Sequence, residues 1–364
     1  MSAPVVIAQT DRLTRLRTRL RAAGLDGVVL TKPQNVAYLT GFTGSAGVAV
    51  VTEADAHLVL DFRYLEQAAN QAPGCRRVKA NGPLLDAAAA LLRDLGVQRI
   101  GVEADTMPVG PFRRMQDALQ PAEIVPLDGL DHLRWQKDAD EIRTIRRAAD
   151  VADAAFLAVL PQIRPGAVER EIAAALEHEL RRRGSDRMPF DLIVASGPRS
   201  ALPHGVASDR AIGPGEFVVI DFGAVVAGYH SDCTRTVVTA PVTEQHRHIY
   251  DVVLRAQLGA LAALRAGMTG READALGRRP IVEAGLGDAF GHSLGHGVGL
   301  AIHEGPTLSP REEATLTPGA VVTVEPGVYL PGWGGVRIED LVVITEDGCD
   351  ILTHLPKDLH EATA

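Results

Sequence analysis

The sequence predicts a mixed α/β (α+β) protein with two domains, residues 1–130 and residues 131–364. Helical and strand-like segments alternate through the first 130 residues, a pattern typical of an α/β domain. Near residue 130, turn-rich sequence gives way to a long amphipathic segment, and strand-like and glycine-rich segments dominate the rest. A chain of 364 residues is also long for a single compact core, which favours two domains.

In the first domain, apolar periodicity predicts a helix over 12–24, ended by Gly24, and a strand in the DGVVLT that follows. Further strands are expected in AGVAVVT, HLVLDF and RIGVEAD, and helices in YLEQAANQA, LLDAAAALLRDLG and PFRRMQDALQ. The stretch Asn35–Ala46 is expected to be a loop, either structural or able to reach a neighbouring site. No phosphate-binding GxGxxG or P-loop motif occurs in this domain.

The second domain is expected to begin with a helix at about 138–160, followed by a helix at 168–184. The basic run Arg181–Arg183 suits the end of that helix, where positive charge complements the helix dipole. One helical interval is expected at 243–285 among the strands, and no internal repeat is obvious.

Composition disfavours several classes of protein. The net charge of −9, without a dense Lys/Arg block, argues against binding to nucleic acid or to an anionic membrane. No apolar stretch reaches the roughly 18 residues of a membrane span, and no signal peptide is evident, so a cytoplasmic location is expected. The three cysteines are widely spaced and form no CxxC pair, which indicates neither a disulfide framework nor a zinc ribbon.

Two acidic residues flank a predicted hairpin in EFVVIDFGAVVAGYHSDCTRTVV (216–238). If the turn pivots between Val226 and Ala227, Asp221 and Asp232 lie directly opposite each other. Like charges at that position destabilise a sheet, so some other group must offset their repulsion.

A second acidic pair lies in VVTVEPGVYLPGWGGVRIEDLVVI (321–344). Two apolar runs flank the turn-forming PGWGG, and a hairpin centred on Gly332 places Glu325 opposite Glu339. A single acidic pair could lie on the solvent-exposed face of a strand. Two acidic pairs embedded in apolar strands indicate that the carboxylates are buried. Four buried carboxylates need cations to offset desolvation and repulsion, which divalent metals provide.

The glycine-rich segment GHSLGHGVGLAIHE (291–304) contains His292, His296 and His303. Glycines let the backbone approach a metal site closely. One imidazole and four carboxylates form a hard, oxygen-rich ligand set that suits Mn²⁺, with Co²⁺ or Zn²⁺ in its place. The sequence therefore predicts a two-metal cluster with the ligands Asp221, Asp232, His296, Glu325 and Glu339.

Two competing motifs fail on their context. GHSLG matches the GxSxG nucleophile elbow with Ser293 as nucleophile, but neither a convincing strand precedes it nor a good helix start follows. His303-Glu304 lacks the second histidine of an HExxH zinc site, because position 307 is Thr.

This constellation resembles the pita-bread metallopeptidases, which include methionine aminopeptidase, aminopeptidase P and prolidase. The matching segments are SGPRSALPHG, IDFGAVVAGYHSDCTRT, GHGVGLAIHE, EPGVY and GVRIED. The ALPH segment and YLTGFTGS in the first domain make the chain most similar to bacterial Xaa-Pro peptidases with a creatinase-like N-terminal domain. The sequence departs from relatives at Phe62, where they often carry Gly.

The resemblance implies a role for each ligand. Asp221 and Asp232 would bind one metal, His296 and Glu325 would serve the second, and Asp232 and Glu339 would bridge the two. Glu325 would also accept a proton from the water that attacks the peptide bond.

The resemblance also assigns residues around the metals. His204, His292 and His303 would position the substrate and transfer protons near the proline nitrogen. Arg337 would lie on the same strand face as Glu339 and support a metal-bound carboxylate, and Tyr329 would line the substrate pocket.

The expected function is hydrolysis of the Xaa-Pro bond, most simply as an Xaa-Pro dipeptidase (prolidase) acting on dipeptides. An Xaa-Pro aminopeptidase acting on longer peptides remains open, as does a non-catalytic binding protein that keeps the fold. The intact ligand set favours an enzyme, and relatives of this kind are commonly homodimers.

Overall fold

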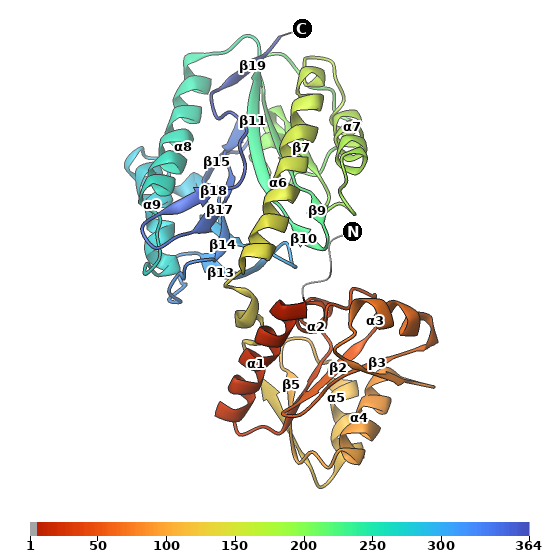
Figure 1. Cartoon of the computed structure of the whole chain (residues 1–364). Coiled ribbons are helices and arrows are strands. Elements are labelled where there is room, and N and C mark those ends of the chain that lie inside the picture. Colours follow the sequence, from red (N-terminus) through yellow and green to blue (C-terminus); the bar gives the residue numbers. More distant parts are fainter. Residues whose placement is uncertain (1–5, 364) are drawn as a thin grey trace. The chain divides into compact units, whose positions relative to one another are not determined.

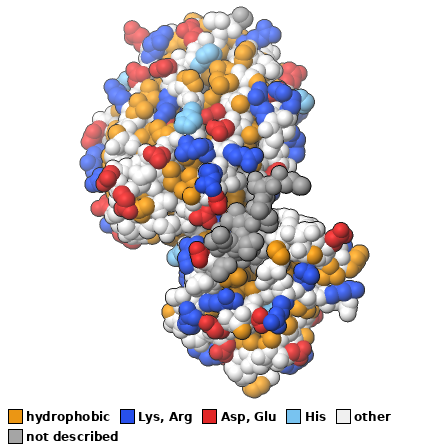
Figure 2. Space-filling view, in the orientation of Figure 1, with side chains coloured by type: hydrophobic (Ala, Val, Ile, Leu, Met, Phe, Trp, Pro, Cys, Tyr) orange, Lys and Arg blue, Asp and Glu red, His pale blue; other side chains and the backbone are white. Residues whose placement is uncertain are grey.

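The computed structural model describes residues 6–363 and divides the chain into two compact units (Figure 1). The first unit ends at Arg134 and the second begins at Trp135. All three cysteines are free thiols. Within the described residues, no helix is both long and apolar enough to span a membrane. Figure 2 shows positive and negative side chains interspersed over the face in view.

The first unit is a six-stranded sheet with the strand order β4-β3-β2-β1-β5-β6. β2 runs antiparallel to both of its neighbours, and the other pairs are parallel. Its strands are β1 (Gly27–Leu30), β2 (Val48–Thr52), β3 (Ala56–Leu60), β4 (Arg76–Lys79), β5 (Arg99–Glu103) and β6 (Glu123–Leu127). Its helices are α1 (Val6–Ala22), α2 (Pro33–Thr40), α3 (Leu65–Gln71), α4 (Leu84–Asp94) and α5 (Val109–Leu119). The strands and helices expected from periodicity are thus present.

The expected loop at Asn35–Ala46 is wrong in its first half, which forms most of helix α2. Pro33 stands in the first turn, where its fixed φ suits a helix, and Gly41 closes the helix with φ 81°. Asn35 and Tyr38 are buried, and their side chains donate hydrogen bonds to Glu103 and to the Leu133 carbonyl. The polar composition that indicated a loop therefore belongs to a buried, hydrogen-bonded helix.

The second unit contains two helix pairs, each followed in sequence by antiparallel strands. The helices are α6 (Ala139–Val159), α7 (Glu169–Arg182), α8 (Glu244–Ala263) and α9 (Gly270–Glu283). The first pair precedes the sheet β19-β11-β8-β7, with β7 (Ile193–Ser196), β8 (Phe217–Phe222), β11 (Cys233–Thr239) and β19 (His360–Ala362). The second pair precedes the sheet β13-β12-β14-β17-β18, with β12 (Gly295–Gly297), β13 (Glu304–Leu308), β14 (Val321–Val324), β17 (Asp340–Ile344) and β18 (Cys349–Ile351).

Two short hairpins complete the unit. They are β9 (Val225–Val226) with β10 (Tyr229–His230), and β15 (Gly327–Leu330) with β16 (Gly334–Arg337). The helix–helix–strand order thus occurs twice, an internal repetition of architecture that the sequence does not reveal.

The single helical interval expected at 243–285 is two helices. The break between them contains Gly267, with φ 85°, and the second helix begins with a capping box between Thr269 and Glu272. The other expected helices of this unit, including the one that ends at the basic run near Arg182, are confirmed.

Alternation along the strands separates the core from the opposite face. On β8, Val218, Ile220 and Phe222 belong to the apolar cluster built with α6 and α7. On β14, Val322 and Val324 belong to the cluster built with α8 and α9. Because neighbouring residues of a strand point to opposite faces, the side chains between these positions face away from the helices.

Candidate metal centre

The acidic residues predicted as ligands lie on the strand faces that point away from the helix pairs. Asp221 follows Ile220 on β8, and Glu325 follows Val324 at the end of β14. Glu339 directly precedes β17, whose Val342 and Ile344 face the α8/α9 cluster. The alternation that buries the apolar residues under the helices therefore presents the carboxylates to a shared space between the two sheets.

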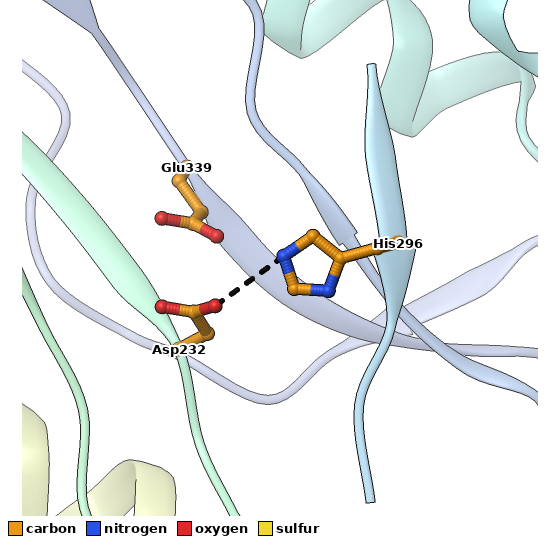
Figure 3. Close-up of side chains that lie close together, drawn as sticks. All are labelled: Asp232, His296 and Glu339. Carbon is orange, nitrogen blue, oxygen red and sulfur yellow. Dashed lines mark ion pairs between the residues drawn. The ribbon is translucent and has the colours of Figure 1, made fainter. Parts of the chain in front are cut away.

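Asp232, His296 and Glu339 form a compact cluster, with one possible ligand atom from each lying within 4.8 Å of the others. Figure 3 shows the three side chains approaching from different elements, His296 from β12 and the two acids from the segments before β11 and β17. The Nε2 atom of His296 lies 3.5 Å from Asp232 Oδ2 and 3.3 Å from Glu325 Oε1. These contacts bring four of the five predicted ligands together.

The tautomer of His296 suits a metal ligand. Its Nδ1 lies 3.1 Å from the carbonyl oxygen of Gly297, so the Nδ1–H donates there and the Nε2 lone pair faces the carboxylates. Burial lowers the pKa of His296, which favours the neutral ring that a metal requires.

Asp221 is connected to the cluster through Arg337. The Nη2 of Arg337 donates to Asp221 Oδ2 at 2.6 Å, and its Nε donates to the Thr234 hydroxyl at 3.0 Å. The same Thr234 hydroxyl donates to Glu339 Oε2 at 2.6 Å. Arg337 and Thr234 together thus hold two of the predicted ligand carboxylates in position.

The unsatisfied atoms in this cluster fit divalent cations. Asp221 Oδ1 and Glu339 Oε1 are buried side-chain oxygens without a hydrogen-bond partner, and buried polar atoms are rarely left so. Burial, and then the neighbouring carboxylates, raise the pKa of Asp232 and of Glu339 well above ordinary values. Burial also raises the pKa of Glu325. The carboxylate cluster thus has oxygen lone pairs without partners, and it resists ionisation in the absence of a counter-charge. A pair of divalent ions would supply both the missing partners and the positive charge.

The other predicted histidines lie around the same cavity. His204, His292 and His303 all line it, and the ring of His303 lies 4.4 Å, centroid to centroid, from that of His296. Burial lowers the pKa of His292 and of His303. The cavity measures about 440 Å³ and is also lined by the ligand residues, Arg337, Phe190 and Asp191.

Tyr329 occupies a different position from the one expected. It is not among the residues that line the cavity, and it is 8% exposed. Its hydroxyl lies 2.9 Å from His292 Nε2 and accepts a hydrogen bond of 2.9 Å from Arg337 Nη1. The Tyr329 hydroxyl therefore links His292, which lines the cavity, to Arg337, which supports Asp221. Tyr329 itself lies outside the cavity lining.

The two predicted hairpin registers had different outcomes. The register centred on Gly332 is confirmed, because Leu330 pairs with Gly334 and Val324 pairs with Asp340, which leaves Glu325 and Glu339 opposite each other. The register of the first hairpin is wrong by two residues, because Asp221 pairs with Thr234 and not with Asp232.

The first turn explains the difference. Val226 pairs with Tyr229, so the two-residue loop is Ala227-Gly228, and both residues have positive φ, 49° and 84°. That pattern is a type I′ turn, which places its pivot between Ala227 and Gly228. Thr234 takes the position opposite Asp221, and Asp232 lies two residues before it, directly ahead of β11.

Sequence reasoning missed the hydroxyls that hold the ligands. Besides Thr234, the Thr323 hydroxyl donates to Glu325 Oε1 at 2.9 Å and accepts from the His296 backbone N–H at 3.0 Å. Each threonine lies two residues from an acidic ligand, a spacing that puts both side chains on one strand face and could have indicated the contact.

A buried charge network behind Glu339 was also missed. The Nη2 of Arg235 donates to Asp340 Oδ1 at 2.8 Å, its Nη1 donates to the Glu339 carbonyl, and Lys357 pairs with Asp340. Although burial alone would raise the pKa of Asp340, Arg235 and Lys357 hold that pKa below its ordinary value. This network fastens β11 to β17 directly beside the metal ligands.

Family models match both units of the chain. The model described as metallopeptidase family M24 matches residues 143–346, and the creatinase/prolidase N-terminal domain matches residues 12–136. The chain belongs to metallopeptidase family M24. The fold is therefore a creatinase-type N-terminal domain followed by a pita-bread catalytic domain, and the chain is a peptide-bond hydrolase of this metal-dependent family.

Relatives in family M24 match nearly the whole chain. It is 45% identical to the solved structure of an Xaa-Pro dipeptidase from Bacillus anthracis, with a TM-score of 0.94 over 97% of this chain and 99% of that one. It is 39% identical to an Xaa-Pro dipeptidase from Pyrococcus furiosus, over 96% of this chain and 99% of that protein. It is also 38% identical to the solved X-Pro aminopeptidase from Thermotoga maritima, with a TM-score of 0.89 over 96% of this chain and 99% of that one.

Proposed function

We propose that this chain is a dinuclear-metal exopeptidase that hydrolyses the Xaa-Pro bond of dipeptides, with Asp221, Asp232, His296, Glu325 and Glu339 as the metal ligands. The observation that carries the proposal is the carboxylate cluster on the cavity wall, with two buried oxygens left without partners. The dipeptidase relatives support the choice of substrate. Mn²⁺ is the proposed metal, because oxygen-rich ligand sets with one imidazole suit it.

When bound, the divalent ions supply Lewis acidity that polarises the scissile carbonyl and lowers the pKa of water. The chain itself provides the proton transfers. Glu325, whose Oε1 faces His296, accepts the proton of the attacking water. His303 remains neutral because burial lowers the pKa of its ring, so it can donate a hydrogen bond near the leaving proline nitrogen. Burial also lowers the pKa of His292, whose Nδ1–H faces the Ser293 carbonyl at 2.8 Å, so its ring lines the substrate site.

Arg337 and His204 position other groups of the site and take no part in bond breaking. Arg337 holds Asp221 at 2.6 Å and contacts the Pro203 carbonyl at 3.2 Å, so it ties a ligand to the segment that carries His204. His204 lines the cavity and orients the substrate beside the metals.

Hydrolysis of Leu-Pro tests the proposal. Purified protein is assayed for free proline with added Mn²⁺, with and without a chelator, and compared with Asp232→Ala and Glu339→Ala. We expect chelator-sensitive release of proline by the wild type, and loss of both bound metal and turnover in the variants. No metal-dependent release from Leu-Pro or from Leu-Pro-Gly would refute a peptidase, and full turnover by either variant would refute the bridging roles.

An Xaa-Pro aminopeptidase is the second candidate, since the similarity to the Thermotoga maritima enzyme favours it. Comparing rates on Leu-Pro and Leu-Pro-Gly separates the two, because only a dipeptidase loses most of its rate when one residue is added. A non-catalytic binding protein would keep the fold but release no proline; the complete ligand set speaks against it.

The assembly and location of the protein belong to the same proposal. We propose a homodimer in the cytoplasm that binds neither nucleic acid nor membrane. The net charge of −9 and the interspersed surface charges in Figure 2 support the last point. Size-exclusion chromatography with light scattering measures the assembly directly.

A further inference from the structure

Residues 202–206 carry His204 at the metal cavity without a packed core to support them. The side chains of Leu202, His204 and Val206 are exposed, and Leu202 and Val206 keep 52% and 48% of their accessible surface. Within residues 6–363 the His204 side chain forms no hydrogen bond or ion pair. Apolar burial therefore contributes little to the position of this stretch, and polar contacts must supply it.

The carboxylate of Glu169 is bonded to residues on both sides of His204. Glu169 is the first residue of α7 and is fully buried. Its Oε1 accepts from the backbone N–H and from the hydroxyl of Ser196, each at 2.8 Å. Its Oε2 accepts from the N–H of Ser208 at 3.1 Å and from the Ser208 hydroxyl at 2.7 Å. A buried carboxylate is costly without its hydrogen bonds, so moving either serine away from Glu169 is unfavourable.

Arg199 connects this buried carboxylate to the backbone beside His204. Its Nη1 donates to Glu169 Oε2, and its Nη2 donates to the carbonyl oxygen of Val206 at 2.7 Å. The N–H of Val206 in turn donates to the His204 carbonyl at 2.9 Å. A guanidinium is planar and presents its donors in a fixed fork, so it holds both acceptors in one geometry.

We propose that Glu169 and Arg199 are positioning residues for the peptidase reaction, and that they act by holding His204 at the metal cavity. The assignment rests on the proposed function, in which His204 orients the substrate. Neither Glu169 nor Arg199 lines the cavity, so both act through the segment that they hold. Without this pair, residues 202–206 would spend only part of the time in the arrangement that receives a substrate, and the apparent affinity would fall by that fraction.

The loss should appear in KM and not in kcat. Once a substrate is bound beside His204, the groups that break the bond are unchanged. If Arg199→Gln leaves the segment in its binding position about one-fifth of the time, KM for Leu-Pro rises about fivefold while kcat stays within about twofold. Bound metal should not change, because the Arg199 side chain donates to Glu169 and Val206, which are not predicted ligands.

The kinetic test uses Leu-Pro and the Mn²⁺-loaded wild type, Arg199→Gln and Arg199→Lys, each with and without His204→Ala. With His204→Ala, Arg199→Gln should change KM by less than about twofold, because the residue that it positions is gone. Arg199→Lys should give an intermediate KM, since it keeps the charge beside Glu169 but lacks the fork. An equal rise in KM with and without His204 would overturn the assignment, as would wild-type KM in both Arg199 variants.

Hydrogen exchange tests the same assignment without turnover. The Gly205 N–H donates to the Leu202 carbonyl at 3.0 Å, so peptides that cover residues 199–208 report on this stretch. We expect faster exchange there in Arg199→Gln and unchanged exchange in α8, whereas unchanged exchange in both regions would overturn the assignment. Failure of the proposed function looks different, because the wild type would then release no proline while the exchange result still stands.

Arg170→Gln is the matched control. Arg170 follows Glu169 on α7 and pairs with Asp209, and both members of that pair are exposed. The substitution removes the same charge close to the Glu169–Arg199 pair, so it should leave KM and the exchange of residues 199–208 unchanged. Effects as large as those of Arg199→Gln would overturn the assignment. If Arg199→Gln does not fold, Arg199→Lys is measured against this control by the same criteria.

Discussion

At the scale of single residues, the metal centre concentrates negative charge that the protein alone does not neutralise. Asp232 and Glu339 are almost fully buried, and each is surrounded by further carboxylates. The buried Arg337 pairs with the carboxylate of Asp221, whereas the buried Arg235 reaches only the backbone carbonyl of Glu339. The metal-free protein therefore carries repulsion that bound metal would convert into attraction.

Glu339→Gln should separate these two effects. The amide removes one charge from the cluster, so the metal-free variant should be more stable than the metal-free wild type by about 1 kcal/mol or more. Added Mn²⁺ should raise its melting temperature much less than that of the wild type, because the proposed bridging ligand is lost. Thermal melts with chelator and with Mn²⁺ measure both. A variant that is destabilised without metal would contradict the account.

Tyr329→Phe should reduce activity without removing metal. The variant loses the hydroxyl between His292 and Arg337, so we expect kcat/KM to fall about tenfold, with metal content unchanged. Metal analysis and Leu-Pro kinetics are the measurements. Tyr250→Phe is the control, since its buried hydroxyl donates to the Lys357 carbonyl outside the cavity. Equal losses of activity in the two variants would argue for a general loss of stability.

At the scale of the elements, the buried charges of Arg235 and Asp340 join the two sheets of the catalytic unit. Arg235 lies on β11 and Asp340 on β17, and the Glu339 backbone N–H donates to the Thr234 carbonyl at 3.1 Å between them. Asp340 also accepts from Gln257 at 2.7 Å and from Thr353 at 2.9 Å. With Lys357, four side chains thus converge on one carboxylate.

Asp340→Asn should be strongly destabilising, because it leaves two cations beside a neutral group in the interior. We expect a loss of about 3–5 kcal/mol in the free energy of unfolding, measured with urea. Glu216→Gln, which weakens the more exposed pair with Arg210, should cost clearly less. Similar losses in the two variants would contradict the importance of burial.

Asp153 on α6 should make stability depend on pH. Burial raises the pKa of Asp153 to about 6, well above the ordinary value for an aspartate. The folded protein therefore binds this proton more tightly than the unfolded chain, and the resulting stability, present at pH 4, is lost as the pH rises through about 6.

Asp153→Asn should abolish this loss of stability at higher pH. The variant should match the wild type near pH 4 and exceed it by up to about 3 kcal/mol at pH 7.5. Urea unfolding of the metal-free proteins at both pH values measures the difference. The same difference at both pH values would show that the side chain acts through packing.

The elements also show what the sequence could and could not predict. The register around Gly332 was predictable because PGWGG marks its turn clearly. The register around Ala227 was not predictable, because an alanine with positive φ is uncommon. The pivot of the turn lies one residue later than predicted, which shifts the strand register by two residues. The predicted ligand set does not depend on that register, since Asp221 and Asp232 still lie near the ends of the neighbouring strands β8 and β11. The contacts of Thr234, Tyr329 and Arg235 join segments far apart in sequence, which periodicity cannot reveal.

At the scale of the whole molecule, all five predicted metal ligands lie in the second compact unit, which begins at Trp135. The hydrogen bonds and ion pairs described for them are made within that unit as well. Metal binding should therefore be a property of this unit alone.

A fragment of residues 135–364 tests this directly. We expect it to bind as much Mn²⁺ per chain as the full-length protein, measured by metal analysis after dialysis. The fragment 1–134 should bind none. Metal binding that requires both fragments together would show that the first unit contributes to the centre.

The order of the ligands along the chain also affects how the protein is made. Asp221 and Asp232 come from the strands after the first helix pair, whereas His296, Glu325 and Glu339 come after the second. A ribosome must therefore synthesise the chain through Glu339 before the last proposed ligand emerges. Until then, the earlier acids have neither their metal nor the Arg337 that supports Asp221. If all five residues bind the metals, complete uptake has to wait until Glu339 has been synthesised, and a nascent chain that stops before Glu339 cannot become an active peptidase.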